Sequence, residues 1–177
     1  LQIPEVSFRH HYEKYFEREG VPKLKDNPGH NFYSCAGRRI LLLCQEGDHI
    51  NEIWSYPCRL MKDYIWSVKP DGKGDIPGRG MPCETTVYPD AVHQHYEYTL
   101  YGVREQIGAN IFQPAAYHQL EVVAERDYAL SLKFTVDFAV MWPMPRGVAG
   151  KIRYCYDKAN KLLKFRSENR KMWCAVS

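Results

Sequence analysis

The chain has 177 residues, with 24 Lys or Arg and 21 Asp or Glu, which gives a formal net charge of +3 at pH 7. This length is typical of one domain with a full hydrophobic core, and so small a charge does not by itself indicate a nucleic-acid partner. No run of about 18 apolar residues and no charged-then-apolar leader occurs, so neither a transmembrane helix nor a signal peptide is expected.

The cysteines are spread along the chain without a Cys-x-x-Cys pair, and the chain is too large to be a small disulfide-stapled scaffold. We therefore predict free thiols in a reducing, intracellular compartment for all six, Cys35, Cys44, Cys58, Cys83, Cys155 and Cys174. The chain begins without an initiator Met, so we expect it to be a piece of a longer protein.

The N-terminal segment has the pattern of a helix. Residues 5–20 carry aromatic side chains at near-helical spacing and close on Gly20, a residue that often ends a helix. Residues 21–30 contain two prolines and Gly29 and are predicted to form a loop. A helix followed by a loop is therefore expected over residues 1–29.

The next stretch begins with two strands. Residues 31–44 are predicted to form these strands on either side of Gly37, the second of them buried because it is nearly all apolar. Residues 45–69 place apolar side chains on one broad side, which favours a short helix. Residues 70–82 are rich in glycine and polar residues and are expected to form a surface loop.

Alternating polar and apolar residues predict strands over 85–92, 97–101 and 109–113, with a turn at 102–108. A proline and two small residues then end the last of these strands, so that Tyr117 and His118 project from its end. Residues 127–138 form a further predicted strand, in which Leu130 and Leu132 lie on one face and Ser131 and Lys133 on the other.

The C-terminal segment is predicted to be one helix over residues 151–173. Its apolar face includes Ile152, Tyr156 and Leu163, and its other face is basic. We expect this basic face to be solvated; contact with nucleic acid or an acidic partner is possible in principle but is not the favoured interpretation.

The run Gly108-x5-Pro114-Ala115-Ala116-Tyr117-His118-Gln119, followed by an apolar strand, resembles the second half of a JmjC domain. JmjC domains are cupins, double-stranded β-helix oxygenases that hold Fe(II) and 2-oxoglutarate inside the barrel. The resemblance covers residues 30–140 and implies that His118 is the last iron ligand.

The same resemblance implies a cosubstrate pocket. Where the family has a lysine that binds the far carboxylate of 2-oxoglutarate, this chain has Arg39, and a guanidinium can bind a carboxylate through two hydrogen bonds. Asn31 and Tyr33 would line the pocket. The alternative, that Arg38 and Arg39 are charges in solvent at the start of a strand, stays open.

The first two iron ligands of the family form His-x-Asp or His-x-Glu, and three interpretations compete for them. His11 and Glu13 have the right spacing but lie far upstream; Asp26 lies nearer to the expected place but lacks its histidine. In the third, His93 and His95 chelate a metal together with His118, because residues two apart on a strand point the same way. A polar strand edge is the favoured interpretation of that histidine pair.

A zinc site is a weaker possibility. Cys58 or Cys83 with Cys155 and Cys174 could imitate the Cys/His zinc of some JmjC domains, but zinc takes four such ligands and no two cysteines are paired in sequence. Isolated thiols are the default expectation.

These observations predict one domain, mostly β, in which a JmjC-like double-stranded β-helix over residues 30–140 is flanked by helices at both termini. A basic helix is expected over 147–177. If the metal site is complete, the resemblance implies a nuclear Fe(II)- and 2-oxoglutarate-dependent oxygenase that hydroxylates or demethylates a protein side chain. The alternatives are an inactive barrel that binds a histone or another chromatin protein, and a metal cupin that uses His93 and His95.

Overall fold

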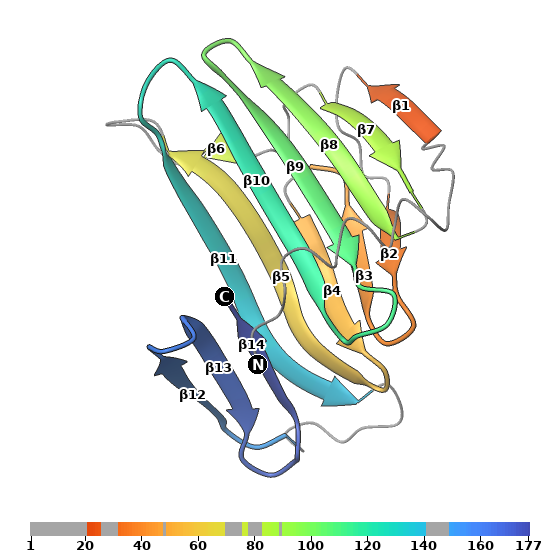
Figure 1. Cartoon of the computed structure of the whole chain (residues 1–177), viewed down its shortest axis with the longest axis vertical. Helices are drawn as coiled ribbons and strands as arrows, with labels where there is room; N and C mark the ends of the chain where they lie inside the picture. Colours follow the sequence, from red (N-terminus) through yellow and green to blue (C-terminus); the bar gives the residue numbers. More distant parts are fainter. Residues whose placement is uncertain are drawn as a thin grey trace.

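The computed structural model describes residues 21–25, 32–47, 49–69, 76–77, 83–88, 90–140 and 149–177. Over these residues every regular element is a β-strand, and the strands form three antiparallel sheets (Figure 1). Within this part of the chain, no helix is long and apolar enough to cross a membrane.

We name the sheets A, B and C. Sheet A has the strand order β1 (Val21–Lys25), β7 (Cys83–Val87), β8 (Ala91–Tyr98), β9 (Tyr101–Ala109), β10 (Ala116–Ala124). Sheet B has the order β11 (Ala129–Val140), β5 (Cys58–Lys69), β4 (His49–Ser55), β3 (Leu41–Gln45), β2 (Phe32–Ala36), and the short β6 (Ile76–Pro77) pairs with β5. Sheet C consists of β12 (Ile152–Asp157), β13 (Leu162–Ser167) and β14 (Trp173–Val176).

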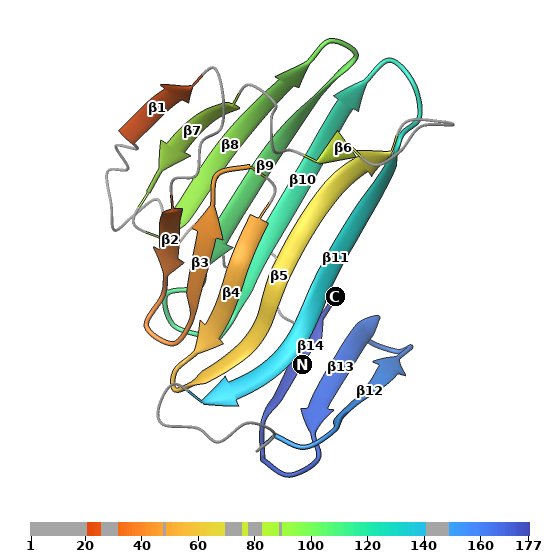
Figure 2. The ribbon, with the colours of Figure 1, turned by 180° about the vertical axis from the view of Figure 1, so that it is seen from behind.

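Sheets A and B stack face to face as a sandwich, with sheet B nearer to the viewer in Figure 2. Their inner faces meet in two clusters of buried apolar side chains, one of which joins Leu42 of β3 to Val92 of β8. In the other, Trp66 of β5 lies edge-on to Tyr96 of β8, with 5.2 Å between the ring centroids. Removal of this apolar surface from water is the main force that holds the two sheets together.

Sheet C packs against the lower part of the long strands β5 and β11, as Figure 1 shows. Met61 and Phe138 of those strands share a buried cluster with Cys174 of β14. The rings of Phe134 and Phe165 also meet edge to face, with 6.1 Å between their centroids. A continuous apolar contact therefore joins sheet C to sheet B.

The residues that resemble the JmjC motif span the end of β9, the β9–β10 loop and the start of β10. Tyr117 lies over Gly108, where an added Cβ would come within 2.3 Å of the tyrosine ring. The side-chain oxygen of Asn110 accepts hydrogen bonds from the backbone N–H groups of Phe112 and Gln113, at 2.8 and 3.0 Å, and so shapes the loop. In this structure the glycine thus leaves room for the ring of the half-exposed Tyr117.

The predicted double-stranded β-helix with flanking helices is wrong, although the β-rich class is compatible with the structure. Residues 151–173, predicted to be a helix, form the strands of sheet C. Their apolar residues fit the alternation of a strand as well as the periodicity of a helix. The side-chain oxygen of Asp157 also stabilises a turn between β12 and β13, because it accepts hydrogen bonds from the N–H groups of Ala159 and Asn160. The predicted N-terminal helix over 5–20 lies outside the described residues.

Three further local predictions are corrected. The helix expected within 45–69 is the hairpin of β4 and β5, which turns at Tyr56-Pro57. Strand β1 begins at Val21, inside the predicted loop, and the turn expected at 102–108 is part of β9. The strands expected over 31–44 and 127–138 are confirmed by β2, β3 and β11.

Candidate ligand-binding site

His118 lies inside the sandwich and both of its ring nitrogens have protein partners. Its Nε2 atom is 2.7 Å from Oε1 of Glu105, and its Nδ1 atom is 3.1 Å from the hydroxyl oxygen of Tyr64. Only 10% of the His118 side chain is exposed. The Tyr64 ring stacks in turn on Phe134, so the histidine is held from two sides.

Glu105 is the centre of this polar network and is 1% exposed. Besides His118, its carboxylate accepts a hydrogen bond from Trp66 Nε1 at 2.9 Å and lies 2.8 Å from the hydroxyl of Tyr96. Burial, and secondarily the Glu105 charge, raises the pKa of Tyr96 well above 10.0. The donors around the buried Glu105 carboxylate offset the cost of removing its charge from water, so the network helps to hold the two sheets together.

The histidines of the metal hypotheses do not come together. Gln94 and Tyr96 of β8 face the interior, so His93 and His95 point to the opposite face of sheet A from His118. Among the residues that the structure describes, no three His, Cys, Asp or Glu side chains form a group that could hold a metal ion.

His11, Glu13 and Asp26 lie outside the described residues. The described part of the chain therefore does not by itself fit an Fe(II) site, and iron, 2-oxoglutarate and the oxygenase activity stay predictions. The cysteines proposed for zinc, Cys58, Cys83, Cys155 and Cys174, are all free thiols, as are Cys35 and Cys44.

The residues expected to bind 2-oxoglutarate are also separated. Arg39 is exposed in the turn between β2 and β3. Tyr33 points into the sandwich, where its hydroxyl donates to the side-chain oxygen of Gln94 at 2.9 Å, and burial raises its pKa well above 10.0. Asn31 lies outside the described residues.

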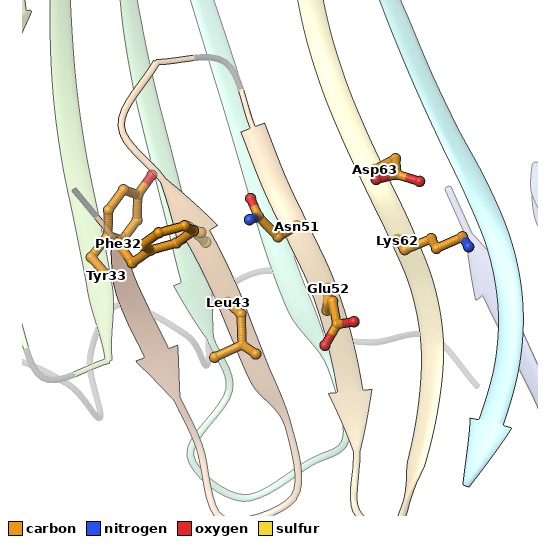
Figure 3. A pocket seen from close by; sticks show the side chains of 8 residues that line it. Phe32, Tyr33, Leu43, Asn51, Glu52, Lys62 and Asp63 are labelled. Carbon is orange, nitrogen blue, oxygen red and sulfur yellow. The ribbon is translucent and has the colours of Figure 1, made fainter. Parts of the chain in front are cut away.

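A groove of about 460 Å³ crosses strands β2 to β5 of sheet B (Figure 3). Phe32 and Leu43 give it an apolar end, and Asn51 and Asp63 lie toward its polar end. The remaining lining residues are Tyr33, Cys44, Glu52 and Lys62. Phe32 is 71% exposed, so its ring is available to a ligand.

The charges beside the groove neutralise one another. Arg59 contacts the carboxylates of Glu52 and Asp137 at 2.5 and 2.7 Å. Lys62 also contacts Asp137, at 3.1 Å. Glu52 accepts a further hydrogen bond from Trp54 Nε1 at 2.7 Å, which fixes the carboxylate against the sheet. The groove therefore presents a field that is nearly neutral near Glu52 and Lys62.

Two polar groups of the groove keep hydrogen-bonding capacity. The side-chain oxygen of Asn51 is buried and accepts no hydrogen bond from a described residue. The Asp63 side chain is 57% exposed, and its nearest ionic partner is His49 Nε2 at 3.9 Å. Asp63 has a φ of 53°, a conformation in which Asp is among the better-tolerated residues.

No protein-family model, curated protein or solved structure matches this chain.

Proposed function

We propose that the protein is a binding domain that holds a neutral oligosaccharide in the groove of sheet B. The observation that carries this proposal is the exposed Phe32 ring in a groove that is also lined by amide and carboxylate side chains. Catalysis is not part of the proposal.

The chemistry of the groove suits a sugar. An aromatic ring offers an apolar face on which the C–H groups of a pyranose can pack, and Phe32 supplies one. Asn51 lines the groove with an amide group, and the exposed Asp63 carboxylate can accept hydrogen bonds, as sugar hydroxyls require. Because the nearby Glu52 and Lys62 are already ion-paired, a charged ligand would gain little from them.

The position of the main acid–base pair of the described chain supports binding over catalysis. Glu105 and His118 belong to sheet A and lie buried between the sheets, where their side chains bond each other, Trp66 and Tyr64. None of these four residues lines the groove. A protein ligand, as in the inactive-barrel alternative drawn from the sequence, stays a prediction, and the experiment below separates it from a sugar.

The test is calorimetric titration of the whole chain with hexasaccharides of glucose, xylose and mannose. We expect at least one of them to bind with a Kd in the micromolar to millimolar range, corresponding to about −4 to −8 kcal/mol. Phe32→Ala should weaken this binding by about tenfold, because one aromatic stacking surface contributes on the order of 1 kcal/mol.

Phe112→Ala is the matched control, because Phe112 is also an exposed phenylalanine, 61% exposed, but lies in the β9–β10 loop away from the groove. It should leave saccharide affinity unchanged. Equal losses in the two variants, or binding of none of the saccharides, would overturn the proposal. Binding of a peptide library at Phe32 in place of the sugars would favour the protein-ligand alternative.

A further inference from the structure

Sheet C carries a row of three exposed side chains, and none of them lines the groove of sheet B. Its register places Arg153 opposite Arg166 and Arg166 opposite Trp173, so one residue from each strand lies in the row. All three are exposed, and Trp173 is 70% exposed. The next residue, Cys174, is buried against β5 and β11, so Trp173 points away from sheet B.

Three more cations lie at the same end of sheet C. The carbonyl of Lys151 accepts a hydrogen bond from the N–H of Glu168 at 3.0 Å, which brings the start of β12 beside the β13–β14 turn. That turn contains Arg170 and Lys171, and all three cations are exposed. We call this set the Trp173 cluster: Lys151, Arg153, Arg166, Arg170, Lys171 and Trp173.

The positive charge of the chain is concentrated in the segment that contains sheet C. Residues 149–177 contain eight Lys or Arg and two Asp or Glu, a formal charge of +6, whereas the whole chain has +3 and the remainder therefore −3. Within the cluster, the described residues provide one ion pair, between Arg153 and Glu168 at 2.6 Å. Both side chains of that pair are substantially exposed, so it leaves most of the positive potential intact.

We infer that the Trp173 cluster binds single-stranded nucleic acid. Five cations around one open indole match a ligand that alternates phosphates with flat bases, because the cations can contact phosphates while a base stacks on Trp173. Arg166, next to the indole in the row, can contact either a phosphate or a stacked base. The inference does not depend on the saccharide groove, which is on sheet B.

Other anionic partners use only part of this surface. An acidic peptide would pair with the cations without needing the indole. An anionic membrane would favour several apolar side chains beside the cations, and Trp173 is the one large apolar side chain of the cluster. These partners are therefore outcomes that the experiment must separate from nucleic acid.

The experiment is fluorescence anisotropy of a labelled oligothymidylate of about 20 nucleotides with the whole chain, in NaCl from about 50 to 300 mM. Affinity should fall as salt rises, with a log–log slope of about −2 to −3 if three to four phosphates are contacted. Trp173→Ala should weaken binding about tenfold and abolish any quenching of tryptophan emission by the bound strand. Arg166→Ser combined with Lys171→Ser should weaken binding and make the salt slope shallower.

The matched control removes two cations from the opposite end of the same sheet, Lys158→Ser with Lys161→Asn. Asn suits position 161 because Lys161 has a φ of 53°. This control should change affinity much less than the Arg166 and Lys171 pair. Equal losses in the two pairs, an unaffected Trp173→Ala variant, or no binding at about 50 mM NaCl would each overturn the inference. So would equal affinity for heparin or phosphatidylserine vesicles that is independent of Trp173.

Discussion

Replacement of the buried Glu105 by glutamine should cost the protein a large share of its stability. Glu105→Gln keeps the shape of the side chain but removes its charge and turns one acceptor into an NH₂ donor. Trp66 Nε1 and His118 Nε2 lie 2.9 and 2.7 Å from Oε1, and the Tyr96 hydroxyl lies 2.8 Å from Oε2. A glutamine that keeps its oxygen at the Oε1 position therefore directs its NH₂ group at the Tyr96 hydroxyl, which can accept a hydrogen bond.

The magnitude follows from the partners that remain. Tyr96 can still donate to the Gly47 carbonyl or to Gln94, while Trp66 and His118 Nε2 keep an amide oxygen in place of the carboxylate oxygen. Each of the three hydrogen bonds to Glu105 loses its charged acceptor, which costs on the order of 1 kcal/mol per bond. We therefore expect a loss of about 2–4 kcal/mol from a total that is typically about 5–15 kcal/mol.

The assay is urea denaturation followed by tryptophan fluorescence, which Trp66 reports from inside the network. With slopes of about 1–3 kcal/mol per molar, the midpoint should fall by roughly 1–2 M. Glu121→Gln is the control, because this glutamate is 55% exposed and its ionic partner among the described residues is Arg104, at 3.4 Å. Its cost should stay below about 1 kcal/mol. A Glu105→Gln cost that is no larger than the Glu121→Gln cost would refute this account of the network.

Two further predictions concern the turn at Gly37 and the buried phenols. Gly37→Ala should destabilise by at least about 2 kcal/mol in thermal unfolding, because its Cβ would lie 1.9 Å from the backbone oxygen of Asn110; Gly102→Ala, whose nearest contact would be 3.5 Å, should cost much less, and equal costs would contradict the packing argument. Since burial raises the pKa values of Tyr33 and Tyr96 well above 10.0, their contribution to stability is complete below pH 10 and is lost as pH rises through the folded-state pKa values. The free energy of unfolding should thus fall above pH 10, with phenolate absorbance at the unfolding transition, and a constant value from pH 9 to 12 would contradict this.

Strands with clean alternation could be predicted from the sequence. The alternation of Leu130 and Leu132 with Ser131 and Lys133 has no helical counterpart, and β11 pairs those two leucines with the buried Val68 and Trp66. The β2–β3 hairpin could also be predicted, because Gly37 separates two strand-like runs. In each case the local pattern favoured a strand over a helix.

The C-terminal segment could not be decided by its apolar spacing. Ile152, Tyr156 and Leu163 suit a helical face, yet they also occupy one face of sheet C. The turn decided between the two: Asp157 accepts from the backbone N–H groups of Ala159 and Asn160 and forms an ion pair with Lys164 at 2.6 Å. An Asp three residues before an Asn is a turn signal that the helical periodicity concealed.

The candidate site was less predictable than the strands. The sequence predicts a turn at Glu105, although Tyr101, Val103 and Ile107 alternate with it as buried residues, a pattern that marks a carboxylate on an inner face. The groove has no local signal at all. Phe32, Asn51 and Asp63 come from three different strands and become neighbours only through the order of sheet B.

The pairing of β5 with β11 also sets the order in which the chain can fold during synthesis. β5 is made early, yet its partner begins at Ala129, and most of sheet A lies between the two in the sequence. While the ribosome makes that intervening segment, the edge of β5 that will pair with β11 has no hydrogen-bonding partner strand. The apolar face of β5 is then exposed to other chains. Such a late, non-local closure is slow, so nascent β5 is where we would expect a chaperone to bind first.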